Sequence, residues 1–173
     1  MGTGGKSAPV PGGTVRLRPP RNPLDTRAVG WWRTHCLLGS GTPALTLAGL
    51  GLLIGPARLW LLPAAVLAVL GGAASVLLPL WWYRLHRWEV TDTAVYTRSG
   101  YLWQEWRVAP VSRIQTVDTT RGPLQNLFGL ATVVVTTASA KGAVTVVGLD
   151  REVAADLAEQ LTAVTSHTPG DAT

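Results

Sequence analysis

Charge is almost absent from the middle of this 173-residue chain. Between Cys36 and Tyr83 the single charged residue is Arg58, which divides two apolar runs, 36–57 and 59–83. At about 1.5 Å per residue, helices of these lengths measure roughly 33 and 37 Å, enough to cross a hydrocarbon core of about 30 Å. Neither run has the polar face that a soluble helix of this length would need. The sequence therefore predicts a two-helix transmembrane hairpin.

Residues that build catalytic and metal sites are also scarce. Cys36 is the only cysteine, so an internal disulfide cannot form. The ten acidic residues are scattered through turns and the C-terminal segment, with no assembled nucleophile and base. His35, His86 and His167 have no Cys or His partner at ligand spacing. We expect no enzymatic activity, cofactor or metal ion. Because the runs contain no ionisable group for a relay, the hairpin is predicted to be an anchor.

Basic residues gather beside the apolar runs. Arg84 and Arg87 follow the second run, and the connection between the runs holds Arg58 alone. Those that precede the first run are Lys6, Arg16, Arg18, Arg21, Arg27 and Arg33. Loops rich in Lys and Arg stay cytoplasmic, so both termini are predicted to be cytoplasmic. This topology accounts for most of the net charge of +5, and the expected partner is the lipid bilayer, with no nucleic acid. The Ala, Gly, Val, Leu and Arg bias suggests a bacterial gene, and hence a multi-pass protein of the bacterial cell membrane.

Aromatic and basic side chains flank both runs at the predicted cytoplasmic ends. Amphipathic rings are typical of headgroup depth, where an N–H or O–H group stays hydrated. The predicted interface anchors are Trp31, Trp32, Arg33, Trp81, Trp82, Tyr83, Arg84 and Arg87. The alternative is that the tryptophans pack between the helices or onto the following domain. Residues 1–30, rich in Gly, Pro and Arg, predict a disordered basic tail, and residues 31–87 the hairpin with its flanks.

From Trp88 onward, short segments rich in Val, Thr, Ile, Trp and Tyr alternate with turn residues, which predicts a small β domain. The predicted strands are Trp88–Val90, Ala94–Arg98, Tyr101–Ala109, Ile114–Thr120, Ala131–Thr137 and Ala143–Val147. Ser99–Gly100 and Ala140–Gly142 are the predicted hairpin turns, because glycine tolerates the positive φ of tight connections. The fold class is therefore α+β.

Two helical segments are predicted within this domain. Pro123–Phe128 places apolar side chains at helical spacing and is followed by Gly129 as a C-terminal cap. A longer amphipathic helix opens at Asp150 as N-cap. Its apolar stripe consists of Val153, Ala154, Leu157, Leu161 and Val164. This helix is expected to lie against the sheet, and the domain to span residues 88–165, with a frayed tail over 166–173.

Several motifs of the second half resemble one known family. They are Val90–Asp92, Gly100, Val108–Pro110, Ser112–Val117 and, above all, GPLQNLFGLATV over 122–133. Over about 88–165 the chain resembles the bacterial pleckstrin-homology (PH) domain of the membrane-anchored YdbS-like class. The resemblance implies a split, strongly bent β-barrel capped by the C-terminal helix, held on the cytoplasmic face behind one or two spans, without enzymatic activity. The chain departs from the family at Ser139–Gly142, where members often continue with glycines.

Two functions of different class remain open. The first is a protein-interaction scaffold that binds a membrane or cytoplasmic protein. Its candidate surface residues are Arg113, Arg121, Gln125 and Asn126. The alternative at this loop is structural, with Pro123, Leu127 and Phe128 packing into the core and holding it in place. The small residues of Gly71–Ser75 are suited to contact with the first run or with another copy, so a homo-oligomer stays open.

The second function is direct binding of anionic lipid headgroups by the domain. A phosphate pocket needs several basic groups that converge from one loop, together with backbone N–H groups. The basic residues of the domain are instead dispersed, at Arg98, Arg107, Arg113, Arg121 and Lys141. Asp92 lies in the first turn, where a basic residue would help. The sequence therefore favours the scaffold.

Overall fold

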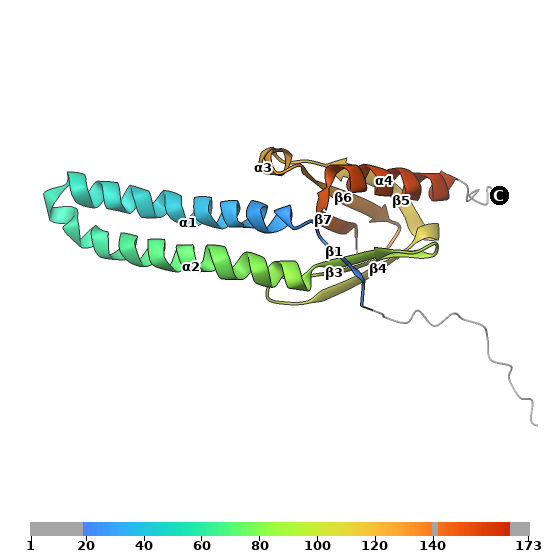
Figure 1. Ribbon diagram of the computed structural model, residues 1–173, viewed down its shortest axis with the longest axis horizontal. Helices are drawn as coiled ribbons and strands as arrows, with labels where there is room; N and C mark the ends of the chain where they lie inside the picture. Colours follow the sequence, from blue (N-terminus) through green and yellow to red (C-terminus); the bar gives the residue numbers. More distant parts are fainter. Residues whose placement is uncertain (1–18, 140–141, 167–173) are drawn as a thin grey trace, which may run out of the picture.

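The computed structural model describes residues 19–139 and 142–166. Figure 1 shows a long two-helix hairpin joined at one end to a small β domain. In chain order the elements are β1 Asn22–Pro23, α1 Arg27–Leu53, the 3-10 helix η1 Gly55–Trp60, α2 Leu61–Leu85, β2 Arg87–Val90, β3 Ala94–Ser99, β4 Glu105–Pro110, the 3-10 helix η2 Val111–Arg113, β5 Ile114–Thr120, α3 Pro123–Leu127, β6 Leu130–Thr137, β7 Val144–Asp150 and α4 Arg151–Ser166. The tail residues 1–18 and 167–173, and Ala140 and Lys141 of a predicted turn, lie outside the described residues.

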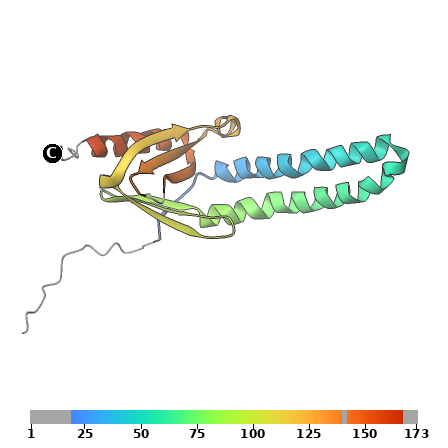
Figure 2. The same ribbon diagram turned by 180° about the vertical axis from the view of Figure 1, so that it is seen from behind.

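Helices α1 and α2 run antiparallel and side by side, and η1 connects them (Figures 1 and 2). Both are long and apolar enough to cross a membrane, and few of their side chains are buried. The hydroxyls of Thr34, Ser40, Thr46 and Ser75 donate to carbonyls one turn earlier in their own helix, at 2.7 to 3.0 Å. These polar groups are therefore satisfied without water.

Glycine at position 71 allows a close approach between the two helices. A Cβ atom at Gly71 would lie 2.3 Å from both Cβ and Oγ of Ser40, whereas one at Gly72 would meet nothing within 4 Å. Gly71 and Ser75 are both buried. Of the two uses predicted for the small-residue segment, the structure shows contact with the first helix.

The β domain consists of two antiparallel sheets, ordered β1-β2-β3-β4 and β5-β6-β7. Among the described residues no ladder joins one sheet to the other, so the implied barrel is not closed. Helix α4 contacts β5, β6 and β7. The α+β fold is confirmed, in the form of two sheets with a C-terminal helix packed against one of them.

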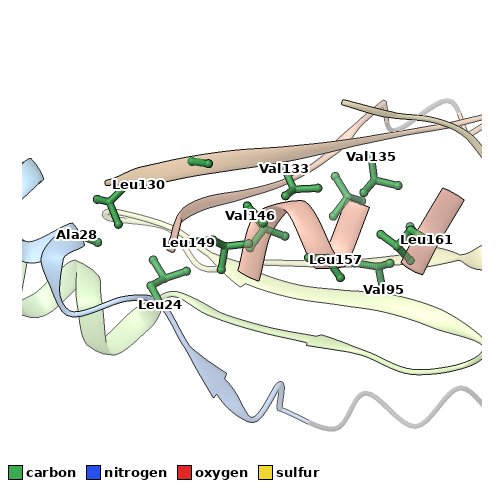
Figure 3. Packing of buried hydrophobic residues seen from close by; sticks show 14 of the residues in the cluster. Leu24, Ala28, Val95, Leu130, Val133, Val135, Val146, Leu149, Leu157 and Leu161 are labelled. Carbon is green, nitrogen blue, oxygen red and sulfur yellow. The ribbon is translucent and has the colours of Figure 1, made fainter. Parts of the chain in front are cut away.

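The core of the domain lies between the two sheets and α4 (Figure 3). Strands β6 and β7 supply the largest share of it, because their inward positions carry Val, Leu and Ala. Its members include Val95, Ala109, Leu130, Val133, Val135, Val146, Leu149, Ala154, Leu157 and Leu161. The predicted stripe of α4 is confirmed at its centre, whereas Val153 and Val164 at its edges are exposed. Asp150 accepts a hydrogen bond from Glu152 N at 2.7 Å, as expected of an N-cap.

The predicted strand Tyr101–Ala109 corresponds to β4, which begins later, at Glu105. Ser99 pairs with Glu105, so residues 100–104 form a loop between β3 and β4 instead of the start of a strand. Gly100 has a φ of +151°, and a Cβ atom there would lie 1.9 Å from the Trp103 carbonyl oxygen. The β-rich composition of Tyr101–Trp103 suggests a strand, but this turn directs the segment away from the ladder.

Residues 22–30 lie within the predicted disordered tail, but they make defined contacts with the domain. Asn22 pairs with Trp88 in β1 and β2, and Trp88 Nε1 donates to the Pro23 carbonyl at 3.1 Å. Leu24 and Ala28 are core residues (Figure 3). The prediction of a disordered tail is therefore wrong for residues 22–30, because contacts made with residues far along the chain order this segment.

Candidate functional site

Residues at the base of the hairpin belong to the hydrophobic core of the β domain. Leu24, Ala28 and Trp32 precede or begin α1, yet they belong to the hydrophobic cluster of the domain, and each is at most 4% exposed. The absence of a side chain at Gly148 of β7 allows Ala28 to pack closely, since a Cβ atom at Gly148 would lie 3.0 Å from Ala28 Cβ. The hydrophobic core of the β domain therefore includes residues that precede the predicted boundary at 88.

Aromatic rings pack where the two helices meet the domain. The Trp32 ring centroid lies 5.9 Å from that of Trp82 and 5.2 Å from that of His86. Tyr101, from the β3–β4 loop, lies 4.6 Å from Trp82 and 5.6 Å from His86. We call these four residues the junction cluster. Because its members come from α1, the end of α2 and a domain loop, it holds three elements in a fixed arrangement.

His86 is the titratable group at the centre of the junction cluster. Its Nδ1 atom lies 2.8 Å from the Trp82 carbonyl, which can only accept, so Nδ1 carries the proton. Burial lowers the pKa of His86 below its usual value. Burial likewise raises the pKa of Tyr101. Both shifts favour the neutral form of each side chain within the cluster.

An ion-pair network joins the start of α1 to the start of α4. Arg27 pairs with Asp25, at 3.0 Å between Nε and Oδ1, and also with Asp150. The Arg27 side chain donates to Asp25 and lowers the pKa of that carboxyl, while the Glu152 N–H group lowers the pKa of Asp150. Asp25 also accepts from the Arg27 backbone at 2.7 Å and so satisfies one of the free N–H groups in the first turn of α1.

The predicted interaction residues fall into three different settings. Arg121, two residues before α3, and Asn126, within α3, are both exposed. Gln125 is only 7% exposed, because its side chain accepts from Gly122 N at 3.0 Å and donates to Thr132 Oγ1 at 2.7 Å. Arg113 is exposed, but it lies before β5 and Arg121 lies after it, so they occupy opposite ends of a strand about 23 Å long. Of the four, Arg121 and Asn126 are thus the exposed residues at α3, and Gln125 helps to hold the loop.

The predicted interface anchors also separate by burial. Trp32 is buried, so for this residue the alternative of packing onto the domain is confirmed. Trp31, Trp82 and Tyr83 are partly buried and pack against the core. Arg33 and Arg87 are partly buried, whereas Trp81 and Arg84 are exposed. Of the eight, Trp81 and Arg84 are therefore the two that the structure leaves exposed.

Three exposed apolar residues near the hairpin base are not among the predicted site residues. Leu102 is 90% and Trp103 86% exposed in the β3–β4 loop, and Leu127 at the end of α3 is 77% exposed. The residues around them in the sequence do not predict this exposure. Tyr101–Trp103 has strand composition, and Leu127 has the spacing of a core residue. Their exposure follows from the Gly100 turn and from Gln125, not Leu127, facing inward.

Within the described residues no group of three or more His, Cys, Asp or Glu side chains could hold a metal ion. Two antiparallel sheets with a C-terminal helix over one of them fit a PH-like α+β fold. A family model described as the bacterial PH domain matches residues 43–165, and the chain belongs to this family. Such modules typically bind proteins or lipids and are non-enzymatic. No curated protein and no solved structure matches the chain.

Proposed function

We propose that the protein is a membrane-anchored PH-like scaffold, with α1 and α2 crossing the bilayer as a hairpin. The outward-facing side chains of these helices support this, because they are large and apolar along most of their length. Exposed examples are Leu45, Leu52, Leu62, Val69, Leu70 and Leu77. An apolar surface of this extent is not maintained in water. From Arg33 to Leu53, α1 measures about 30 Å, which matches the hydrocarbon thickness.

The distribution of arginines supports an orientation with both helix ends at the cytoplasmic face. Arg33 lies near the start of α1 and Arg84 near the end of α2, whereas η1 carries only Arg58. Cytoplasmic flanks carry the excess of positive charge. The domain then lies in the cytoplasm at the surface of a bacterial cell membrane. Assignment to the YdbS-like class stays a prediction of the sequence.

The observation that carries the scaffold function is the entry of the hairpin base into the core of the domain. Leu24, Ala28 and Trp32 connect the two by buried contacts, where a flexible linker would leave the domain free to rotate. A domain fixed in this way presents the same surface to every neighbour in or on the membrane. We propose that the exposed side chains of Arg121 and Asn126 form part of the surface that binds a membrane or cytoplasmic protein.

The arginines of the β domain support a scaffold more than a reader of lipid headgroups. The Arg98 guanidinium lies 5.5 Å from the centre of the Trp106 ring. Arg107 pairs with Glu105 at 2.8 Å and donates to the Ala143 carbonyl at 2.7 Å. Both side chains are therefore engaged within the domain, and they do not converge on a common anion site. Headgroup recognition remains the alternative function.

Photocrosslinking in membranes tests the scaffold. A photoreactive amino acid replaces Asn126 in the full-length chain, and we expect a discrete adduct with another protein. Arg121→Glu is expected to reduce that adduct several-fold, because it reverses a charge beside the probe. Arg113→Glu is the matched control, since it makes the same change at the other end of β5, and it should leave the adduct unchanged. Adducts with lipid alone, or equal loss in both variants, would contradict a protein partner at this surface.

A further inference from the structure

The loop between β3 and β4 exposes more apolar surface than the fold requires. Leu102 and Trp103 are 90% and 86% exposed, and no residue from Gly100 to Gln104 carries a charge. The neighbouring Tyr101 is held in the junction cluster by Trp82 and His86. The loop is therefore fixed at its base, while its two largest apolar side chains have no partner in the described part of the chain.

The position of this loop relative to the hairpin indicates what covers it. In Figures 1 and 2 the β3–β4 connection turns back beside the last turns of α2, on the side of the domain that faces the hairpin. The distance of 4.6 Å between the Tyr101 and Trp82 rings confirms this proximity. Trp82 directly follows the exposed Trp81, near the end of α2. The loop that carries Leu102 and Trp103 thus lies beside the last turns of α2.

A further exposed apolar side chain lies close to the start of α1, as Leu102 and Trp103 lie close to the end of α2. Leu127 is 77% exposed at the end of α3. The next residue, Phe128, packs on the first turn of α1, where a Cβ atom at Gly30 would lie 3.0 Å from its ring. Figure 1 shows α3 on the opposite side of the hairpin from the β3–β4 loop. Exposed apolar groups therefore flank both helices at the same end of the hairpin.

We propose that Leu102 and Trp103, together with Leu127, enter the interfacial layer of the leaflet from which α1 and α2 emerge. This inference rests on the proposed function, because it assumes that the hairpin spans the bilayer. The bilayer is the occupant because the loop lies beside the last turns of α2, which expose Leu80 and Trp81, and because tryptophan rings prefer the headgroup boundary. The domain then contacts the membrane at three places, which are the hairpin, the β3–β4 loop on one side and the end of α3 on the other. These contacts prevent it from tilting about the hairpin.

Spin-label accessibility in liposomes tests this proposal with the full-length chain in a Cys36→Ser background. Nitroxide labels are placed singly at Leu102→Cys, Leu77→Cys and Glu159→Cys, which are exposed positions in the loop, in α2 and in α4. Oxygen collides with labels in lipid, and a water-soluble nickel chelate collides with labels in water. We expect the loop label to be oxygen-accessible, with a nickel accessibility several-fold below that of the α4 label. Adding Trp103→Asp should restore nickel accessibility at the loop without changing the α4 label.

The label at position 77 distinguishes failure of this inference from failure of the proposed transmembrane hairpin. If it reports lipid while the loop label matches the α4 label, the loop is in water and the inference is overturned, but the hairpin stands. If it reports water, the hairpin does not span, and both proposals fail. A loop label shielded from oxygen and nickel alike would show that protein covers it, either a second copy or a partner, and would also overturn the inference.

Discussion

Replacement of Trp32 by alanine is expected to lower the free energy of unfolding by about 3–5 kcal/mol, the usual cost of truncating a buried tryptophan. Trp32 is 4% exposed and packs against Trp82, His86 and the domain core. Its loss opens a cavity where the hairpin enters the domain. Unfolding of the full-length chain in detergent micelles, followed by near-ultraviolet circular dichroism, measures the effect.

Trp81 provides the matched control for this experiment. It is also a tryptophan at one end of the hairpin, but it is 61% exposed. Trp81→Ala should change the free energy of unfolding by no more than about 0.5 kcal/mol, as for surface substitutions in general. Equal effects of the two changes would mean that the Trp32 ring lies in the interface and not in the core, contrary to the structure.

Gly71→Leu is expected to force the two helices apart and to destabilise the hairpin by about 1–3 kcal/mol, the range typical of overpacking. The new Cβ atom would lie 2.3 Å from the Ser40 side chain, and the rest of the leucine has no space between the helices. A lower midpoint of thermal unfolding in micelles is the expected observation.

Gly72→Leu separates this clash from the other consequences of the substitution. It makes the same change one residue later in α2, but a Cβ atom at Gly72 meets nothing within 4 Å. Its thermal midpoint should therefore match or slightly exceed that of the parent chain, since leucine favours the helix over glycine. If Gly72→Leu proved as destabilising as Gly71→Leu, the contact between α1 and α2 would not be as the structure describes it.

Elements with a clear local pattern were predictable from the sequence. Strand Ile114–Thr120 is found with the predicted bounds, and α4 begins directly after its N-cap Asp150. The predicted C-terminal cap Gly129 has a φ of +66°. Each depends on residues close in sequence, such as alternating strand positions, a capping carboxylate or a glycine in the left-handed region.

Features that depend on tertiary contacts were not predictable from local patterns. The burial of Leu24 and Ala28 requires Gly148, which lies more than a hundred residues later in the chain. The burial of Gln125 requires Thr132, and with Gln125 turned inward, Leu127 faces outward. For this reason the candidate surface retains Arg121 and Asn126 from the sequence prediction, whereas the exposed apolar loop was recognised only in the structure.

The most direct test of this account is the side of the membrane on which each end of the hairpin lies. In a Cys36→Ser background, single cysteines replace Arg58 in η1 and Glu159 in α4, both exposed. The account predicts that an impermeant maleimide labels Arg58→Cys in intact spheroplasts and Glu159→Cys only in inverted vesicles. Labelling of Glu159→Cys in intact spheroplasts, or labelling of both positions from the same side, would contradict a hairpin that anchors the PH-like domain at the cytoplasmic face.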